Sequence, residues 1–290
     1  MLTLLFDGVA YGMLLFVLAV GLAVTLGLMN FINLAHGAFA MAGGYTTVLL
    51  MNKLGVPFLA TLPIAFLVSA AAGAVLERTL YRPMYAKPHL DQVLFSIGLV
   101  FMTVAGVDYF IGSQQQIMQL PPYLRGRFDL GAANEYIGIG KYRLFIIVVC
   151  ALLTIVLQTV LSRSRFGSRL RAAVDDPRVA SGLGIDVNRV FLLTFAVGSG
   201  LAGLGGALGA EILGLDPTFP HKFMIYFLIV VSVGGTTTIT GPLLAALLLG
   251  IADVAGKYYV PKLGAFIVYA LMILILVWRP QGLFGRGAAK

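Results

Sequence analysis

This sequence has very few charged residues and only one cysteine. Of its 290 residues, 11% are charged and 59% are hydrophobic. A soluble domain carries roughly 25% charged residues, so this chain cannot cover an ordinary globular surface, and its apolar area must face lipid or other helices. The lone thiol, Cys150, lies in an apolar run and can form no intramolecular disulfide. The shortage of charge excludes a soluble globular protein and indicates a membrane protein.

The motifs of nucleotide, metal and catalytic chemistry are also missing. Nothing resembles GxxxxGK[ST], the loop that cradles nucleotide phosphates, so the chain is not expected to bind ATP itself. His36, His89 and His221 are too far apart in sequence to suggest a metal site. An intramembrane enzyme needs a serine with a histidine, or paired aspartates, at depth, and the pair Asp175 and Asp176 lies in a polar loop. We therefore expect no bound cofactor, no metal and no catalytic residue.

Long apolar runs fill most of the chain. A helix that crosses about 30 Å of hydrocarbon needs roughly 20 mostly apolar residues. Runs of this kind lie near 4–28, 57–76, 91–111, 142–161, 190–213, 222–240 and 262–278, and two shorter Gly- and Ala-rich runs lie near 34–51 and 242–257. Each shorter run predicts either a buried helix or a broken, re-entrant one. We predict an all-α integral membrane protein, a polytopic bundle of about nine (eight to ten) transmembrane helices in a single domain over 1–290.

Two further features refine this picture. The first residues, MLTLLFD, hold an acid where a signal peptide has a basic leader, so the first apolar run is expected to remain as a helix. The run GSGLAGLGGALG at 198–209 places small residues three and four apart. That spacing allows helix backbones to approach closely in a bilayer.

The basic residues predict the orientation. The net charge is +8, but the Lys and Arg residues lie between apolar runs, so positive-inside topology explains them better than nucleic-acid binding. Twelve of the 20 fall in three places: Arg78, Arg82 and Lys87; six arginines from Arg163 to Arg189; and Arg279, Arg286 and Lys290. Assigning these to the cytoplasm places the N-terminus outside and the C-terminus inside. The segment 112–141 then becomes the longest external loop, able to receive an external protein.

The polar loop 163–189 contains the sequence FGSRLRAAVDDPRVASGLGID. Its first part has a helical pattern. Asp176 before Pro177 is a typical start of a second helix, with the aspartate capping free amides and proline at the first helical position. This second helix is predicted from about Pro177 to Leu183, ending at Gly184. The loop is either a rigid knob that docks into a partner's groove or a solvated connector whose arginines satisfy the positive-inside rule.

A second polar segment lies within apolar surroundings. Asn30, Asn33 and His36 are spaced by three and fall broadly along one helical side. Buried polar groups in a membrane are costly, and they are therefore paired or line a pathway. The structural alternative is that Asn33 caps a helix starting near Leu34 and that His36 bonds to neighbouring backbone.

The candidate translocation pathway comprises Asn30, Asn33, His36, Gly37, Gly43, Gly44 and Thr236. Thr236 belongs to a Gly/Thr/Pro stretch that breaks a helix, and a cytoplasmic turn is its alternative interpretation. Asp108, Glu211 and Asp253 lie near expected helix ends and are interpreted as interfacial charges. The pathway set shows no fixed ion pair, which favours a weakly binding conduit.

Four segments resemble the permeases of ATP-driven branched-chain amino acid importers, the LivH type of that ABC importer family. They are GLMNFINLAHGAFAMAGGY at 27–45, FGSRLRAAVDDPRVASGLGID at 166–186, VGGTTTITGPLLAALLLG at 233–250 and RPQGLFGR at 279–286. The resemblance extends over nearly the whole chain. It implies an all-helical permease of the bacterial inner membrane that pairs with a second, related permease subunit, two cytoplasmic ATPases and a periplasmic substrate-binding protein. ATP and Mg would bind to the ATPases. Leucine, isoleucine and valine are the first substrates it implies, with other amino acids, urea or short amides as alternatives.

In that family the polar loop contains the coupling helix, which carries ATPase movement into the membrane domain. The corresponding positions here are Arg171, Ala172, Asp175, Asp176, Pro177, Ala180, Gly182 and Gly184. The small residues allow the loop to pack closely against the ATPase, and the charged residues fix the position at which it docks. The alternative function is a secondary transporter or channel for small polar solutes that acts without an ATPase, which predicts ionisable residues within the spans.

Overall fold

The computed structural model describes residues 1–29, 31–130, 137–235 and 238–283. The helices are α1 Leu2–Met29, α2 His36–Leu54, α3 Phe58–Leu76, α4 His89–Ile111, α5 Lys141–Arg163, α6 Arg165–Asp175, α7 Pro177–Gly182, α8 Val187–Leu213, α9 Phe219–Gly234, α10 Thr240–Tyr259 and α11 Gly264–Trp278. A π-helical turn, Glu77–Tyr81, and a 3-10 turn, Arg82–Met84, continue α3. Short 3-10 turns also occupy Pro122–Leu124 and Pro261–Leu263.

A helix occupies each of the nine apolar stretches that the sequence indicated. Within the described residues, six helices are long and apolar enough to cross a membrane: α1, α3 with its following turns, α4, α5, α8 and α10. This agrees with a mostly helical, multi-pass membrane protein. The count of about nine crossings stays a prediction, because α9 and α11 are shorter apolar helices and α2 does not meet the same criterion.

The segment between α4 and α5 differs from the all-helical prediction. Two short strands, β1 Arg127–Leu130 and β2 Ile137–Gly140, pair antiparallel with Arg127 opposite Gly140. The hairpin precedes α5 directly and forms part of the predicted loop 112–141, of which residues 131–136 lie outside the described part. The strands are therefore an addition to a helical fold.

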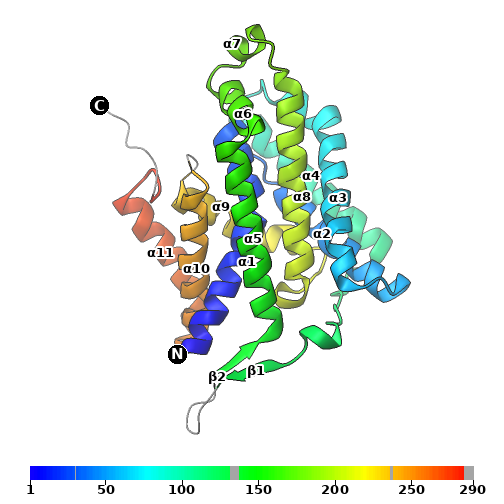
Figure 1. Ribbon diagram of the computed structural model, residues 1–290, viewed down its shortest axis with the longest axis vertical. Coiled ribbons are helices and arrows are strands. Elements are labelled where there is room, and N and C mark those ends of the chain that lie inside the picture. Colours follow the sequence, from blue (N-terminus) through cyan, green and yellow to red (C-terminus); the bar gives the residue numbers. More distant parts are fainter. Residues whose placement is uncertain (30, 131–136, 236–237, 284–290) are drawn as a thin grey trace.

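The bundle has two distinct ends (Figure 1). The helices α6 and α7 lie at the top of that view, and the hairpin β1–β2 lies at the bottom with the N-terminus of α1. We call these the loop end and the hairpin end. The α3–α4 connection and the segment after α11 also point toward the loop end. The three basic segments thus share one end of the bundle, as positive-inside topology requires, although Arg286 and Lys290 lie outside the described residues.

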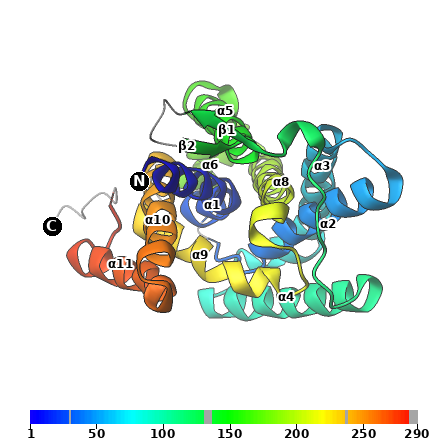
Figure 2. The ribbon, with the colours of Figure 1, turned by 90° about the horizontal axis from the view of Figure 1, so that it is seen from below.

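Two helices form the centre of the bundle. Most of α1 and α8 is buried, and Figure 2 shows α1 surrounded by α5, α8, α9 and α10. The glycines of α8 make this packing possible. A Cβ atom on Gly200 would lie 2.7 Å from the ring of Phe66, and one on Gly205 would lie 2.9 Å from Leu18. The predicted close approach of helices along the 198–209 segment is confirmed.

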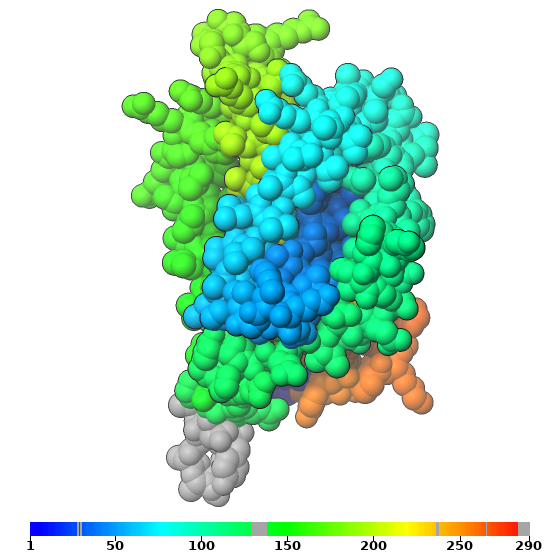
Figure 3. All heavy atoms as spheres, turned by 90° about the vertical axis from the view of Figure 1, so that its right-hand side faces the viewer, coloured from blue at the N-terminus to red at the C-terminus, as the bar shows by residue number. Residues whose placement is uncertain are grey.

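Peripheral helices carry exposed apolar side chains. Phe101 and Met102 on α4 and Val148 and Leu152 on α5 are more than half exposed, which suits contact with lipid or with another membrane protein. Figure 3 shows the first part of α2, in dark blue, in a recess between α3 and α4, while its C-terminal end, in brighter blue, reaches the surface. The α2 helix is therefore an inner helix covered on most sides.

The two shorter runs form continuous helices, α2 of 19 residues and α10 of 20 residues. Neither helix is broken; α2 is mostly buried, whereas α10 is less than half buried. The α9 helix ends at Gly234, earlier than the predicted boundary at 240. The physical reason is that Gly235 adopts φ 81°, a left-handed conformation that a helix cannot continue through.

Candidate functional site

The polar loop at the loop end folds into the two predicted helices, α6 and α7. Asp176 caps α7, since its Oδ1 accepts from the backbone N–H of Arg178 at 2.8 Å and of Val179 at 3.1 Å. Pro177 is the first residue of α7, and the helix ends at Gly182. The helix start inferred from Asp176 and Pro177 is confirmed, and the end is one residue earlier than expected.

The end of α7 is a turn closed by a positive-φ glycine. Gly184 has φ 81°, and its N–H donates to Ser181 O at 3.0 Å. The N–H of Ile185 donates to Ala180 O at 3.0 Å, which is the longer bond of a Schellman-type helix end. Ala180 is fully buried beneath this turn. The turn therefore holds α7 in a defined position relative to the start of α8.

The α6 helix is attached to the bundle on one face. Leu170 and Ala173 are buried against Val190 of α8. The Arg171 side chain donates from Nη1 to Leu161 O of α5 at 2.5 Å. Because α6 is hydrogen-bonded to α5 and packed against α8, a displacement of α6 acts directly on these two membrane helices.

The α7 helix lies at the tip, beyond the ends of the membrane helices (Figure 1). Two apolar side chains are exposed there: Val179 is 59% exposed and Leu183 is 75% exposed. The coupling positions predicted from the sequence include neither residue, and their only signal was an apolar side chain within a polar loop.

The predicted coupling positions divide by exposure. Arg171, Asp175, Asp176, Pro177, Gly182 and Gly184 are exposed, Ala172 is half-buried and Ala180 is buried. The structure thus brings all eight into one protrusion.

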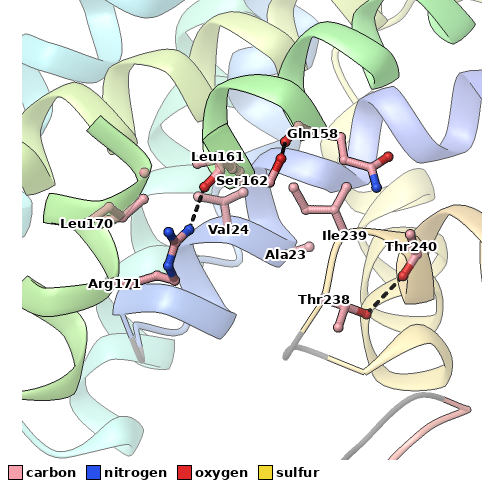
Figure 4. A pocket seen from close by; sticks show the side chains of 11 residues that line it. Ala23, Val24, Gln158, Leu161, Ser162, Leu170, Arg171, Thr238, Ile239 and Thr240 are labelled. Carbon is pink, nitrogen blue, oxygen red and sulfur yellow. Dashed lines mark hydrogen bonds between the residues drawn. The ribbon is translucent and has the colours of Figure 1, made fainter. Parts of the chain in front are cut away.

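A cavity of about 330 Å³ separates α6 from the α9–α10 connection. Figure 4 shows Arg171 and Leu161 on one side of it and Thr238 and Thr240 on the other. The hydroxyl of Thr240 donates to Thr238 Oγ1 at 3.3 Å. Thr236, a candidate pathway residue, lies outside the described residues. The cavity leaves room for α6 to move toward the α9–α10 connection.

The second candidate segment, between α1 and α2, turns back into the bundle. His36, the first residue of α2, donates from Nε2 to Leu18 O of α1 at 2.9 Å. Leu18 is 11 residues before the end of α1, which corresponds to about 16 Å along a helix axis. The chain therefore runs back into the interior before α2 begins. Such irregular backbone is tolerated at membrane depth only where protein covers it or where it lines a cavity.

Three buried polar side chains secure this returning segment. Asn33 Oδ1 accepts from the Ala35 N–H at 3.1 Å and from the Tyr81 hydroxyl at 3.0 Å. Gln92 Oε1 accepts from the Ile32 N–H at 3.2 Å. Asn33, Tyr81 and Gln92 are each at most 2% exposed. The α3–α4 corner thus supplies hydrogen-bond partners to the non-helical residues that precede α2.

This geometry corrects the sequence-based arrangement of the segment. Residues 31–35 are not helical and α2 starts at His36, two residues after Leu34, so Asn33 and His36 do not lie on one helical side. The polar residues stop the helix before His36 because Asn33 bonds locally to backbone. Asn30 lies outside the described residues.

The candidate pathway glycines lie at helix contacts. A Cβ atom on Gly37 would lie 3.0 Å from Pro220 Cα, and one on Gly44 would lie 2.8 Å from Leu215. A Cβ atom on Gly43 would overlap the backbone of Gly203. Each glycine has a packing reason, and contact of these residues with a substrate stays a prediction.

One acid that the sequence suggested as an interfacial charge has a different environment. Asp253 lies within α10 and is only 2% exposed. Its Oδ2 pairs with Lys257 Nζ at 2.6 Å. This pair joins two residues one helical turn apart near the end of α10, and neither residue belongs to the candidate pathway set.

The comparisons with known proteins agree with this architecture. The family described as branched-chain amino acid transport system / permease component matches residues 4–276. BraD of Pseudomonas aeruginosa, a high-affinity branched-chain amino acid transport system permease protein, is 29% identical over 97% of this chain and 95% of its own length. LivH of Escherichia coli is 28% identical over 97% of this chain and 94% of its own length.

The similarity extends to a second kind of permease protein. LivM of Escherichia coli is 29% identical over 93% of this chain and 68% of its own length. No solved structure matches this chain. The family match covers the bundle from α1 to α11 with the polar loop included, and the chain therefore belongs to the family of permease components of branched-chain amino acid transport systems.

Proposed function

We propose that this chain is the membrane-spanning permease subunit of an ATP-driven importer, which passes branched-chain or related amino acids from a periplasmic binding protein into the cytoplasm. Family membership and the multi-pass helical fold support the transport role. The observation that carries the ATP-driven part is the α6–α7 protrusion, attached to two membrane helices on one side and apolar at its tip.

The tip of α7 has the character of a docking surface. Val179 and Leu183 are mostly exposed in a loop whose neighbours include Arg178 and Arg189. Fully burying a leucine side chain stabilises a contact by about 1.5–3 kcal/mol, and the arginines can set the register against acidic groups of a partner. We therefore assign the tip to the ATPase subunit and the residues around it to the coupling element.

A movement of this tip has a route into the bundle. The α6 helix contacts α8 through Leu170 and Val190. Further along α8, the ring of Phe195 lies 4.6 Å from Tyr81 and 5.9 Å from Phe39, centroid to centroid. Tyr81 in turn bonds to Asn33 of the returning segment. Rigid displacement of α8 would thus shift the α1–α2 connection, with the cavity beside Arg171 as the free space.

The proposed assembly contains a second, related permease subunit, two cytoplasmic ATPases and a periplasmic substrate-binding protein. This chain binds no cofactor in the proposal, and ATP and Mg bind to the ATPases. The assembly lies in the bacterial inner membrane, with the loop end in the cytoplasm and the hairpin end in the periplasm. The alternative is a secondary transporter or channel for small polar solutes.

Gentle detergent purification from native membranes tests the proposal, with identification of co-purifying proteins and assay of substrate-stimulated ATPase activity. We expect two ATPase subunits and a second permease. Replacing Leu183 with Glu should release the ATPases. Tyr123→Glu is the matched control, since Tyr123 is 55% exposed at the hairpin end. A stable lone chain that takes up solute on an ion gradient would support the alternative.

A further inference from the structure

A charged cavity lies among the ends of five helices at the hairpin end. Its volume is about 400 Å³, within the range of small-molecule sites. The charged residues that line it are Asp7 of α1, Arg143 of α5, Lys222 of α9, and Asp253 and Lys257 of α10. Neither the polar loop nor the α1–α2 connection contributes to it, so this cavity is separate from the candidate sites described above.

The charges around this cavity are arranged in ion pairs. Arg143 pairs with Asp7, and Lys257 Nζ lies 2.6 Å from Asp253 Oδ2. Lys222 pairs with Asp216. The cationic side chains are 42–57% exposed. Each cation therefore has donors left over that a ligand can reach.

Each lining carboxylate uses only one of its two oxygens. Asp7 Oδ1 and Asp253 Oδ1 are buried and have no hydrogen-bond partner among the described residues. The Asp253 side chain is 3% exposed and that of Asp7 is 19% exposed. Buried polar atoms are nearly always paired. The hydroxyls of Tyr11 and Tyr226 line the same cavity, but among the described residues neither acidic oxygen receives a hydrogen bond.

The mixture of signs limits what can bind there. Three cationic side chains on the wall repel a metal ion or a simple amine, and two carboxylates repel a simple anion. A molecule with both an ammonium and a carboxylate satisfies both sets of groups. Arg143 and Lys222 also stand in the first turns of α5 and α9, and the positive end of a helix dipole favours a carboxylate.

We propose that this cavity binds a zwitterionic α-amino acid. Its ammonium donates to the free oxygens of Asp253 and Asp7, and its carboxylate accepts from Arg143 or Lys257. Ile212, Leu213 and Phe223 supply apolar wall for an aliphatic side chain. The proposal rests on the proposed function in one respect, which is that the hairpin end faces the periplasm. With that orientation, the cavity is the first place in the permease where a released amino acid is held.

Three ligands test the charge requirement on the wild-type complex. L-leucine has both charges, 3-methylbutylamine lacks the carboxylate, and 4-methylpentanoate lacks the ammonium. A ligand that binds only the native state raises the thermal unfolding midpoint. We expect L-leucine to raise the midpoint of the purified permease complex, measured without binding protein, and each analogue to bind at least about tenfold more weakly. Equal shifts with either analogue, or no shift with leucine, overturn the site.

Substitution then locates the site. Asp253→Asn keeps the shape of the side chain and removes its charge, and should weaken leucine binding about tenfold or more. Asp108→Asn, exposed on α4 at the same end, is the control and should bind normally. If Asp253→Asn fails to insert, Asp7→Asn reports on the second free oxygen. Unchanged binding in the inserted variant means that water alone satisfies these oxygens, and refutes the proposal.

The outcomes separate this site from the proposed function. Leucine-stimulated ATPase activity that persists in Asp253→Asn, with unchanged leucine binding, removes the site and leaves the importer function in place. Leucine binding that Asp253→Asn abolishes, in a complex whose ATPase activity no amino acid stimulates even when the binding protein is added, supports the site and removes the importer function.

Discussion

The turn after α7 offers a sharp test of the coupling proposal, through Gly182→Val and Gly184→Val. A Cβ atom at either glycine would meet nothing within 4 Å, so neither variant creates a clash. The two positions differ in backbone conformation, because only Gly184 has a positive φ, of 81°. The pair therefore isolates backbone strain in the coupling loop from the effect of added bulk.

The expected magnitude follows from this conformation. A residue with a side chain in the left-handed region is destabilised by about 1–2 kcal/mol, and a β-branched one by more. That strain acts on the bonds from Gly184 to Ser181 and from Ile185 to Ala180, which hold α7. A difference of 1.4 kcal/mol is about tenfold in an equilibrium. We expect Gly184→Val to lower the equilibrium constant for the native placement of α7 by about fivefold to thirtyfold. The affinity for the ATPase subunits should fall by the same factor.

The assay compares the two variants with wild type after equal membrane insertion is verified. ATPase subunits retained per permease and leucine-stimulated ATPase activity are both measured. Gly182→Val, at the last residue of α7, should stay within about twofold of wild type, since valine is no poorer a helix former than glycine. Full coupling in Gly184→Val, or equal losses in both variants, would refute the reasoning from strain.

Three further predictions follow from packing, polarity and pH. Gly206→Ala should destabilise the fold by about 1–3 kcal/mol because its Cβ would overlap the carbonyl of Ala40, whereas Gly98→Ala, with open space around it, should not lower the unfolding temperature. His36→Ala leaves a buried carbonyl without its partner and should lower stability by about 1–3 kcal/mol; a change in the substrate KM of the folded variant would instead place His36 on the pathway. Burial raises the pKa of Asp216, but hydrogen bonds from Lys222 and Thr218 outweigh it and hold the pKa below its usual range. The carboxylate therefore stabilises the native state at neutral pH, and the difference in unfolding midpoint between wild type and Asp216→Asn should shrink as the pH falls below about 4.

The coupling loop was largely predictable from sequence because its signals are local. Asp176 and Pro177 start a helix, and a glycine at 184 stops it, through bonds within a few residues. The apolar runs likewise located every helix of the bundle to within a few residues, except at α9, whose end depends on the conformation of Gly235. The exposed apolar side chains of Val179 and Leu183 were missed, since their exposure depends on how α7 lies beyond the ends of the membrane helices.

The buried α1–α2 connection could not be derived from spacing. Asn33 and His36 match a helical period, yet the two residues between them form a turn, and the His36 side chain bonds to Leu18 O of α1. Its partners, Tyr81 and Gln92, lie about 50 to 60 residues away in the sequence. A periodic pattern carries no information on such distant partners.

The sequence by itself determined that this is a multi-pass helical membrane protein, which end carries the basic segments, and where two short helices form in its polar loop. These properties depend on residue composition and on interactions within one helical turn, which the order of residues specifies directly. Only the tertiary structure decided which polar groups are buried and with what partners. The cavity that joins Asp7 with Asp253, and the packing of α2 against the glycines of α8, bring together residues from distant segments. Their energetics depend on enclosure by several helices, because a charge or polar group in the bundle is stabilised only by partners that folding places beside it.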